Sequence, residues 1–175
     1  MVYCDMTTDG GGWTIIQKRV DASTEFNRNW DNYTTGFGDP SKEYWIGNDA
    51  IHILTTENDQ ELRVDLMSFH GEKGYALYSM FHVGNETSKY ELNASEFSGT
   101  AGDGFIESNG MKFSTYDHDN DGHDLVNCAK SFRGAWWFKD CGSSNLNGVY
   151  FVSNSLIWRS WIQIGKSVMM IRPKK

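Results

Sequence analysis

The sequence predicts an α+β fold in which a central antiparallel sheet carries an irregular, loop-rich C-terminal region. Residues 61–66 and 75–83 alternate polar and apolar side chains, as half-buried strands do. The two segments follow each other at hairpin distance, which favours antiparallel over parallel pairing. From about residue 98 to 160 the periodicity disappears and Gly, Asn, Asp and Ser dominate. Long irregular stretches in compact domains are usually functional or are held in place by disulfides and bound ions.

The earlier elements can be assigned from turn and cap signals. A glycine turn within residues 9–20 leads into a short apolar strand. Asn48 or Asp49 is a suitable cap for a short helix that ends near Thr55. These signals place a strand and a helix before the alternating pair.

The later strands complete the expected sheet. One face of the strand at 75–83 is expected to carry Tyr75, Leu77, Ser79, Phe81 and Val83. Residues 90–92 extend the same sheet, and residues 167–173 are expected to return to it as a last strand.

Composition fits one domain over residues 1–175. Apolar residues make up 39% and aromatic residues 14% of the 175 residues, which is sufficient for a folded core. The formal charge of −7 disfavours nucleic acid and an anionic lipid surface as partners. No apolar run approaches the roughly 18 residues that span a bilayer, so membrane insertion is not expected.

The cysteines and glycosylation signals favour a secreted, extracellular protein. Cys128 and Cys141 are close enough in sequence to close a loop, and Cys4 is left without a partner in the chain. N-glycosylation acceptor triplets begin at Asn32, Asn85 and Asn93. Three such triplets together with a plausible disulfide indicate an oxidising compartment, and a secretory leader is expected upstream.

The strongest chemical signal is the acidic run Asp-His-Asp-Asn-Asp-Gly at 117–122. Alternate carboxylates followed by Gly gather hard oxygens around one point, which suits Ca²⁺. An EF-hand loop requires Glu at its twelfth position, where this chain has Cys128, so the run is not an EF-hand. The alternative is a solvated acidic turn, but three carboxylates within five residues repel one another and a cation relieves that repulsion.

Signals for catalysis are missing from the sequence. The five His have no zinc-site spacing, and the glycine clusters do not match nucleotide-binding fingerprints. A Gly-x-Ser-x-Gly nucleophile elbow is also absent. We therefore expect no enzymatic activity.

A series of motifs runs in order along the chain: Thr8-Asp9-Gly10-Gly11-Gly12-Trp13-Thr14, Tyr44-Trp45-Ile46-Gly47-Asn48-Asp49, the acidic run, Gly134-Ala135-Trp136-Trp137 and Met170-Ile171-Arg172-Pro173. Together they resemble the fibrinogen C-terminal, or fibrinogen-related, domain, which includes ficolin-like, tachylectin-like and angiopoietin-like proteins. The resemblance covers essentially the whole chain. It implies a fibrinogen-like fold with a short N-terminal subdomain (1–16), a central sheet (17–92 plus 162–175) and a calcium and ligand subdomain (93–161).

The resemblance also implies a calcium site. Asp119 and Asp121 match the side-chain ligands, and Asp117 is expected to support the ion through water. The backbone carbonyls of His123 and Leu125 are expected to complete the shell. In the same family Cys128 and Cys141 match a loop disulfide, and Cys4 matches a cysteine that pairs with one further upstream.

A ligand pocket beside the calcium loop is implied at Phe132, Asp140, Cys141 and Gly142. In the lectins of the family this pocket takes an acetyl group, and Phe132 is a suitable aromatic wall. A cis peptide at Asp140–Cys141 is expected to turn the Cys141 N–H outward. The chain departs from the lectin pattern at Gly142, where a His is usual, and in segment 150–158, which is shortened.

Two functions remain open at this point. One is a pattern-recognition lectin of innate immunity that binds microbial, including acetylated, glycans; the breadth of the family and Phe132 support it. The other is a protein-interaction module for a receptor or matrix partner, supported by Gly142 and the shortened segment. The second predicts an exposed apolar patch near that segment and indifference to free sugars. In either case oligomers are expected to form through upstream segments.

Overall fold

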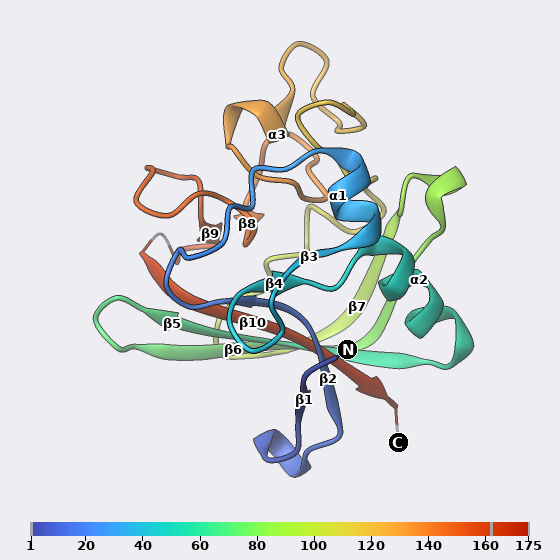
Figure 1. Cartoon of the computed structure of the whole chain (residues 1–175), viewed down its shortest axis with the longest axis vertical. Coiled ribbons are helices and arrows are strands. Elements are labelled where there is room, and N and C mark those ends of the chain that lie inside the picture. The colour runs from blue at the N-terminus through green and yellow to red at the C-terminus, as the bar shows by residue number, and fades with distance from the viewer. Residues whose placement is uncertain (1, 162, 175) are drawn as a thin grey trace.

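The computed structural model describes residues 2–161 and 163–174, and Figure 1 shows its arrangement. The strands of the main sheet are β1 (Cys4–Asp5), β2 (Trp13–Arg19), β3 (Phe37–Gly38), β4 (Tyr44–Trp45), β5 (Gln60–Ser68), β6 (Lys73–Val83), β7 (Leu92–Gly99) and β10 (Ile164–Pro173). Their order is β3-β4-β2-β10-β5-β6-β7, with β1 paired to β2, and every pair is antiparallel. The predicted α+β class with a central antiparallel sheet is confirmed.

The remaining elements are short. They are the 3₁₀ helices η1 (Thr8–Gly10) and η2 (Glu86–Ser88), the helices α1 (Trp30–Thr35), α2 (Asn48–Glu57) and α3 (Cys128–Ser131), and the two-stranded sheet of β8 (Ser144–Asn145) and β9 (Ile157–Trp158). In Figure 1 the three α-helices and the loops of the C-terminal half lie above the main sheet, and the hairpin after β1 projects below it. The C-terminal loops therefore form a layer of their own on one face of the sheet.

Helix α2 begins one residue earlier than its side-chain cap signals predict. Its N-cap is Gly47, with φ +109° and no side-chain hydrogen bond to the helix. A Cβ at Gly47 would overlap the backbone at the end of α1, so only glycine fits here. Asn48 does not cap the helix because its side chain accepts a hydrogen bond from the Trp45 indole N–H (3.1 Å).

The expected face of β6 is right only at the C-terminal end of the strand. Phe81 and Val83 are buried as predicted, but in the first half the core side chains are Ala76 and Tyr78. The register with β5 shifts between Tyr78 and Phe81. A bulge of this kind reverses the alternation along a strand. The predicted face is therefore wrong for the three residues before the bulge: Tyr75, Leu77 and Ser79.

Strand β10 lies in the middle of the sheet, as the expected return of the last strand requires. Val168 is paired with Lys18 of β2 on one side and with Asp65 of β5 on the other. Met169 and Met170 are both buried although they face opposite sides, because each face of the sheet carries its own apolar cluster. A strand covered on both faces is nearly continuously apolar.

The sheet does not follow the expected subdomain limits. Strand β2 runs across the limit at residue 16, and β7 continues the sheet from residue 92 to Gly99. The limit at residue 162 lies outside the described residues. Within the described ranges, the helices are all too short or too polar to cross a bilayer.

Candidate functional site

Buried aromatic side chains, rather than strands, hold the C-terminal loops on the sheet. Trp136, Trp137 and Trp158 are fully buried in this region. Each indole N–H has a partner, so their burial leaves no donor unpaired: Ser144 Oγ for Trp136 (3.0 Å), Tyr90 O for Trp137 (2.7 Å) and Gly102 O for Trp158 (3.0 Å). This cluster is the rigid base from which the candidate site projects.

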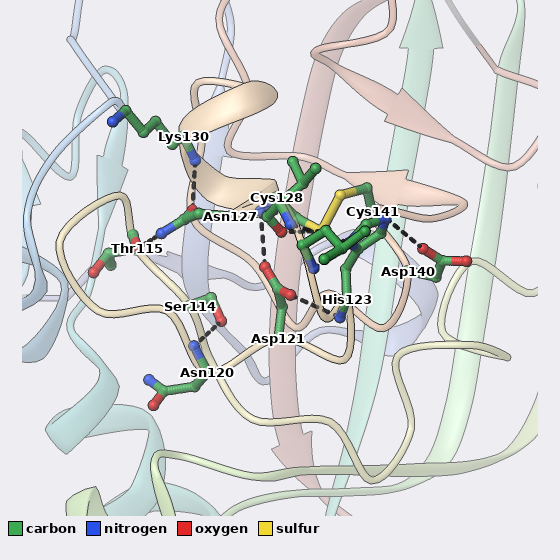
Figure 2. The surroundings of a disulfide bond; sticks show 12 residues. Ser114, Thr115, Asn120, Asp121, His123, Asn127, Cys128, Lys130, Asp140 and Cys141 are labelled. Atoms are coloured by element: carbon green, nitrogen blue, oxygen red, sulfur yellow. Dashed lines mark hydrogen bonds and ion pairs between the residues drawn. A yellow bond between two sulfur atoms is a disulfide. The ribbon is translucent and has the colours of Figure 1, made fainter.

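Cys128 and Cys141 form the disulfide that their sequence positions suggest (Figure 2). Cys128 is buried at the start of α3, and its partner is half-buried in the loop that follows Asp140. Cys4 is exposed and has a free thiol in the described part of the chain. The disulfide thus fixes one end of the predicted ligand pocket to the core.

Asp121 joins the acidic run to the disulfide. Its two carboxylate oxygens accept hydrogen bonds from the backbone N–H groups of His123 (2.9 Å) and Cys128 (2.8 Å), as Figure 2 shows. Burial raises the pKa of Asp121, and the neighbouring carboxylate of Asp119 raises it further. Asp121 is therefore a structural anchor as well as a predicted ion ligand.

The side chain of His123 makes a second connection that the sequence did not predict. Its Nδ1 accepts hydrogen bonds from the N–H groups of Leu125 and Val126, both at 3.1 Å. Its Nε2 lies 3.5 Å from a carboxylate oxygen of Asp140 (Figure 2). The imidazole therefore bridges the acidic run and the loop that carries Cys141.

Asp117 fastens the acidic run to helix α1. Its Oδ1 accepts hydrogen bonds from the backbone N–H of Trp30 (3.0 Å) and from the Thr115 hydroxyl (2.6 Å). Burial acts to raise the pKa of Asp117, but these hydrogen bonds outweigh it and leave the pKa below its usual range. The direct contacts of Asp117 are thus with the protein itself.

Asp119 and Asp121 supply oxygens of the kind that Ca²⁺ accepts, and the calcium site remains a prediction. In the described ranges no three His, Cys, Asp or Glu side chains converge on one point, so side chains alone cannot complete a shell. Ca²⁺ takes six to eight oxygens and accepts backbone carbonyls and water among them. Burial is the main cause of the raised pKa of Asp121 and the charge of Asp119 adds to it, and a divalent cation would offset both effects. The carbonyls of His123 and Leu125 remain the predicted further ligands.

Asp140 and Gly142 flank Cys141, and Phe132 caps the helix that begins at Cys128, but one expected feature of the pocket is wrong. The described residues contain no cis peptide bond, so Asp140–Cys141 is trans. The chain turns there because Cys141 adopts a left-handed conformation, with φ +53°. A Cβ at Gly142 would lie 3.1 Å from a carboxylate oxygen of Glu107.

Phe132 is held more firmly than a free pocket wall. It is the C-cap of α3, and its ring lies 6.4 Å from that of Phe138 between centroids. Its carbonyl accepts a hydrogen bond from the Ser155 hydroxyl (2.6 Å). The residue as a whole is half-buried.

The predicted glycosylation acceptors differ in accessibility. Asn93 is exposed on β7, and Asn85 is exposed where its Oδ1 caps η2 by accepting from the Ser88 N–H (3.1 Å). Asn32 lies within α1 and is half-buried. Asn85 and Asn93 therefore present their amides to modification more openly than Asn32 does.

A hollow of about 560 Å³ lies beside the shortened segment, and the sequence assigned no role to its aromatic residues. The exposed fraction is 52% for Phe69 and 84% for Phe151, and their rings stack with centroids 5.5 Å apart. No sequence signal connects these residues, because one lies in the β5–β6 turn and the other in the loop after β8. The exposed apolar patch that a protein-binding module predicts here is present.

Comparisons with known proteins identify the family and the fold of the chain. The family model for the C-terminal globular domain of fibrinogen beta and gamma chains matches residues 1–174. Ryncolin-4 from Cerberus rynchops is 44% identical over 187 residues, covering 100% of this chain and 54% of the relative. Fibrinogen-like protein A from Apostichopus parvimensis is 51% identical over 153 residues, covering 86% of this chain and 54% of the relative. The chain thus spans about half the length of these relatives.

Solved structures show the same fold. The fibrinogen-like globe domain of human ANGPTL6 is 37% identical, with a TM-score of 0.95 over 99% of this chain and 83% of that one. Lamprey fibrin D-dimer in complex with the peptide ligand Gly-His-Arg-Pro-amide is 31% identical, with a TM-score of 0.91 over 99% of this chain and 64% of that one. The chain therefore belongs to the family of the fibrinogen C-terminal globular domain, as the order of its motifs predicted.

Proposed function

We propose that the chain is the non-catalytic recognition domain of a secreted protein and that it binds microbial glycans in a calcium-dependent manner, as a pattern-recognition lectin of innate immunity. Its disulfide and the exposed acceptors Asn85 and Asn93 support secretion. Membership of a family of recognition domains supports binding without catalysis.

The observation that carries the proposal is the double link between the acidic run and the disulfide loop. Asp121 accepts the N–H of Cys128, and His123 faces Asp140 next to Cys141. An ion held by Asp119 and Asp121 would therefore restrain the segment that carries the predicted pocket. Binding energy that is not spent on ordering a loop is available to the ligand.

Retention on an N-acetylated resin tests this proposal. The domain, displayed in several copies on a carrier, is applied to the resin in buffer with calcium and, separately, in buffer with chelator. Bound protein is eluted with acetate or N-acetylglucosamine. We expect retention that requires calcium, is released by acetate and falls in Phe132→Ala but not in Ile53→Ala, which removes an exposed apolar side chain on α2. Absence of retention by folded, calcium-loaded protein would contradict the acetyl-lectin proposal.

Recognition of a receptor or matrix protein is the second candidate function. Two observations favour it: Gly142 offers no side chain to a sugar, and Phe69, Phe151 and Val152 form an exposed apolar patch. Patches of this kind commonly mark protein partners. On this view a tetramerised domain binds cells in excess free sugar, and protease treatment of the cells abolishes binding. Binding to cells that free sugar inhibits and that survives protease treatment of the cells would reject this second function.

A further inference from the structure

The hollow beside the shortened segment has exposed aromatic walls that contact other parts of the chain. Phe151 has φ +61°, a conformation that bulky residues rarely adopt, and such outliers concentrate at functional sites. Its ring stacks on Phe69 with an angle of 20° between their planes. Phe69 in turn lies against Gly165, where a Cβ would come within 3.2 Å of the ring. The two rings are therefore held in place by elements that are distant in sequence.

Tyr150 forms the inner wall of the same hollow. Its hydroxyl donates to the backbone carbonyl of Gly165 (3.0 Å), and the Arg19 guanidinium lies 4.7 Å from its ring centroid. Its ring centroid is 6.3 Å from that of Phe69 and 5.8 Å from that of Phe151. Three aromatic rings thus converge on one hollow, and preorganised walls of this kind reduce the entropy cost of binding.

The rest of the lining is polar but uncharged. His70 Nε2 lies 3.1 Å from Gln163 Oε1, so the imidazole donates and the amide N–H groups of Gln163 remain available. Ser153 and Asn154 add further hydrogen-bonding groups. The described lining contains no Asp, Glu, Lys or Arg, although 22% of the chain is charged. This lining suits a neutral ligand with one apolar face and several hydroxyl groups.

We propose that this hollow is a separate glycan subsite that takes a neutral sugar ring. The C–H face of the ring packs against the exposed ring of Phe151, which is backed by Phe69, and its hydroxyls meet Gln163 and Asn154. The inference rests on glycan recognition as the function, but it uses residues outside the disulfide loop. A stable protein interface buries about 800 Å² per partner. A hollow lined by amides and aromatic rings fits a single sugar ring better than it fits the broad surface of a protein partner.

Nuclear magnetic resonance can locate the binding. Uniformly ¹⁵N-labelled, calcium-loaded domain is titrated with methyl β-galactoside, methyl α-mannoside and N-acetylglucosamine. We expect saturable shifts of the backbone amides of Phe69, Phe151 and Gln163 with at least one of these sugars. Phe151→Ala and Gln163→Ala should each weaken this binding by roughly tenfold, the loss expected for one stacked ring or one polar anchor. Ile53→Ala, a matched loss of an exposed apolar side chain, should leave it unchanged.

Two outcomes would overturn the subsite. The first is that sugar binding does not involve these residues: none of the sugars shifts their amides, or Phe151→Ala leaves the affinity for the sugar unchanged. The second is concentration-dependent self-association, measured by sedimentation, that Phe151→Ala abolishes while sugars have no effect; the surface would then bind a second copy. Shifts at Phe132 and Gly142 report the disulfide-loop site, so failure of one proposal is distinguishable from failure of the other.

Discussion

At the scale of single residues, three aspartates in one acidic run have different partners. Asp117 is bound to the N-terminus of α1, Asp121 to the disulfide, and Asp119 acts on Asp121 through its charge. A shared motif therefore combines structural anchoring with the predicted ion binding. Substitutions that separate these roles are the direct test.

Replacing Asp117 should destabilise the fold whether or not calcium is present. Asp117→Ala leaves the N–H of Trp30 and the hydroxyl of Thr115 without their acceptor, which costs about 1–2 kcal/mol in the free energy of unfolding. Urea denaturation in chelator measures this loss. Asp124→Ala is the matched control, because Asp124 is exposed in the same loop and should change stability by less than about 0.5 kcal/mol. Equal losses in both variants would contradict the anchoring role.

Replacing Asp121 should remove the response to calcium. Asp121→Asn keeps one of the two oxygen acceptors, leaves the second backbone N–H facing an amide NH2, and removes the charge that attracts the ion. At a hundredfold excess over its Kd, an ion that binds only the folded state adds about 2.7 kcal/mol of stability. We expect calcium to raise the Tm of the native chain but not that of Asp121→Asn, with Asp124→Asn behaving like the native chain. An unchanged calcium response in Asp121→Asn would place the ion elsewhere.

Some of these residue roles could be predicted from the sequence and others could not. The alternate carboxylates predicted oxygens gathered around one point, and the resemblance to the fibrinogen family singled out Asp119 and Asp121, whose charges do act on each other. The roles of Asp117 and of the His123 ring were not predictable, because their partners Trp30 and Asp140 come from other segments. Contacts between remote segments leave no local pattern in a sequence.

At the scale of elements, regular strands were easier to predict than their irregularities. Alternation correctly predicted β5, in which Leu62, Val64 and Leu66 are buried. It misassigned the first half of β6 because the bulge beside Tyr78 has no sequence signature. The cap of α2 was missed for a related reason: Gly47 is required by the close approach of α1, which is a tertiary contact.

Loss of the disulfide should destabilise the C-terminal loops. The bond joins Cys128 and Cys141 across a separation of 13 residues, and closing a loop of about this length contributes about 3 kcal/mol in the chain-entropy model. Cys128→Ala combined with Cys141→Ala should reduce the free energy of unfolding by about 2–4 kcal/mol, measured in urea. Cys4→Ala should have little effect, since Cys4 is exposed. A double variant as stable as the native chain would show that the aromatic cluster holds these loops unaided.

At the scale of the whole molecule, buried tyrosines make the fold sensitive to alkali. Burial raises the pKa of Tyr44 to about 12, and burial also raises the pKa of Tyr33, Tyr78, Tyr90 and Tyr150. In the unfolded chain these phenols ionise near pH 10, so above that pH the unfolded state has lost protons that the folded state keeps. Stability is therefore fully present below pH 10 and decreases as the pH rises toward 12 and beyond.

Absorbance at 295 nm and circular dichroism, followed together from pH 9 to 13, test this sensitivity. We expect the five buried phenols to ionise in step with the loss of tertiary structure, with stability falling by up to about 1.4 kcal/mol per pH unit for each. Ionisation of all tyrosines near pH 10 with intact circular dichroism would refute the expected burial.

The central position of β10 has a consequence for biosynthesis. Strands β2 and β5 both pair with β10, so their facing edges stay open until residues 164–173 have left the ribosome. At 5–20 residues per second, β2 waits on the order of 10 s for its partner. Open strand edges on a nascent chain are prone to aggregation, so this topology leaves the chain at risk of aggregation for most of its synthesis. The two cysteines of the loop emerge before β10, so in the proposed secreted protein the disulfide can close before the sheet is complete.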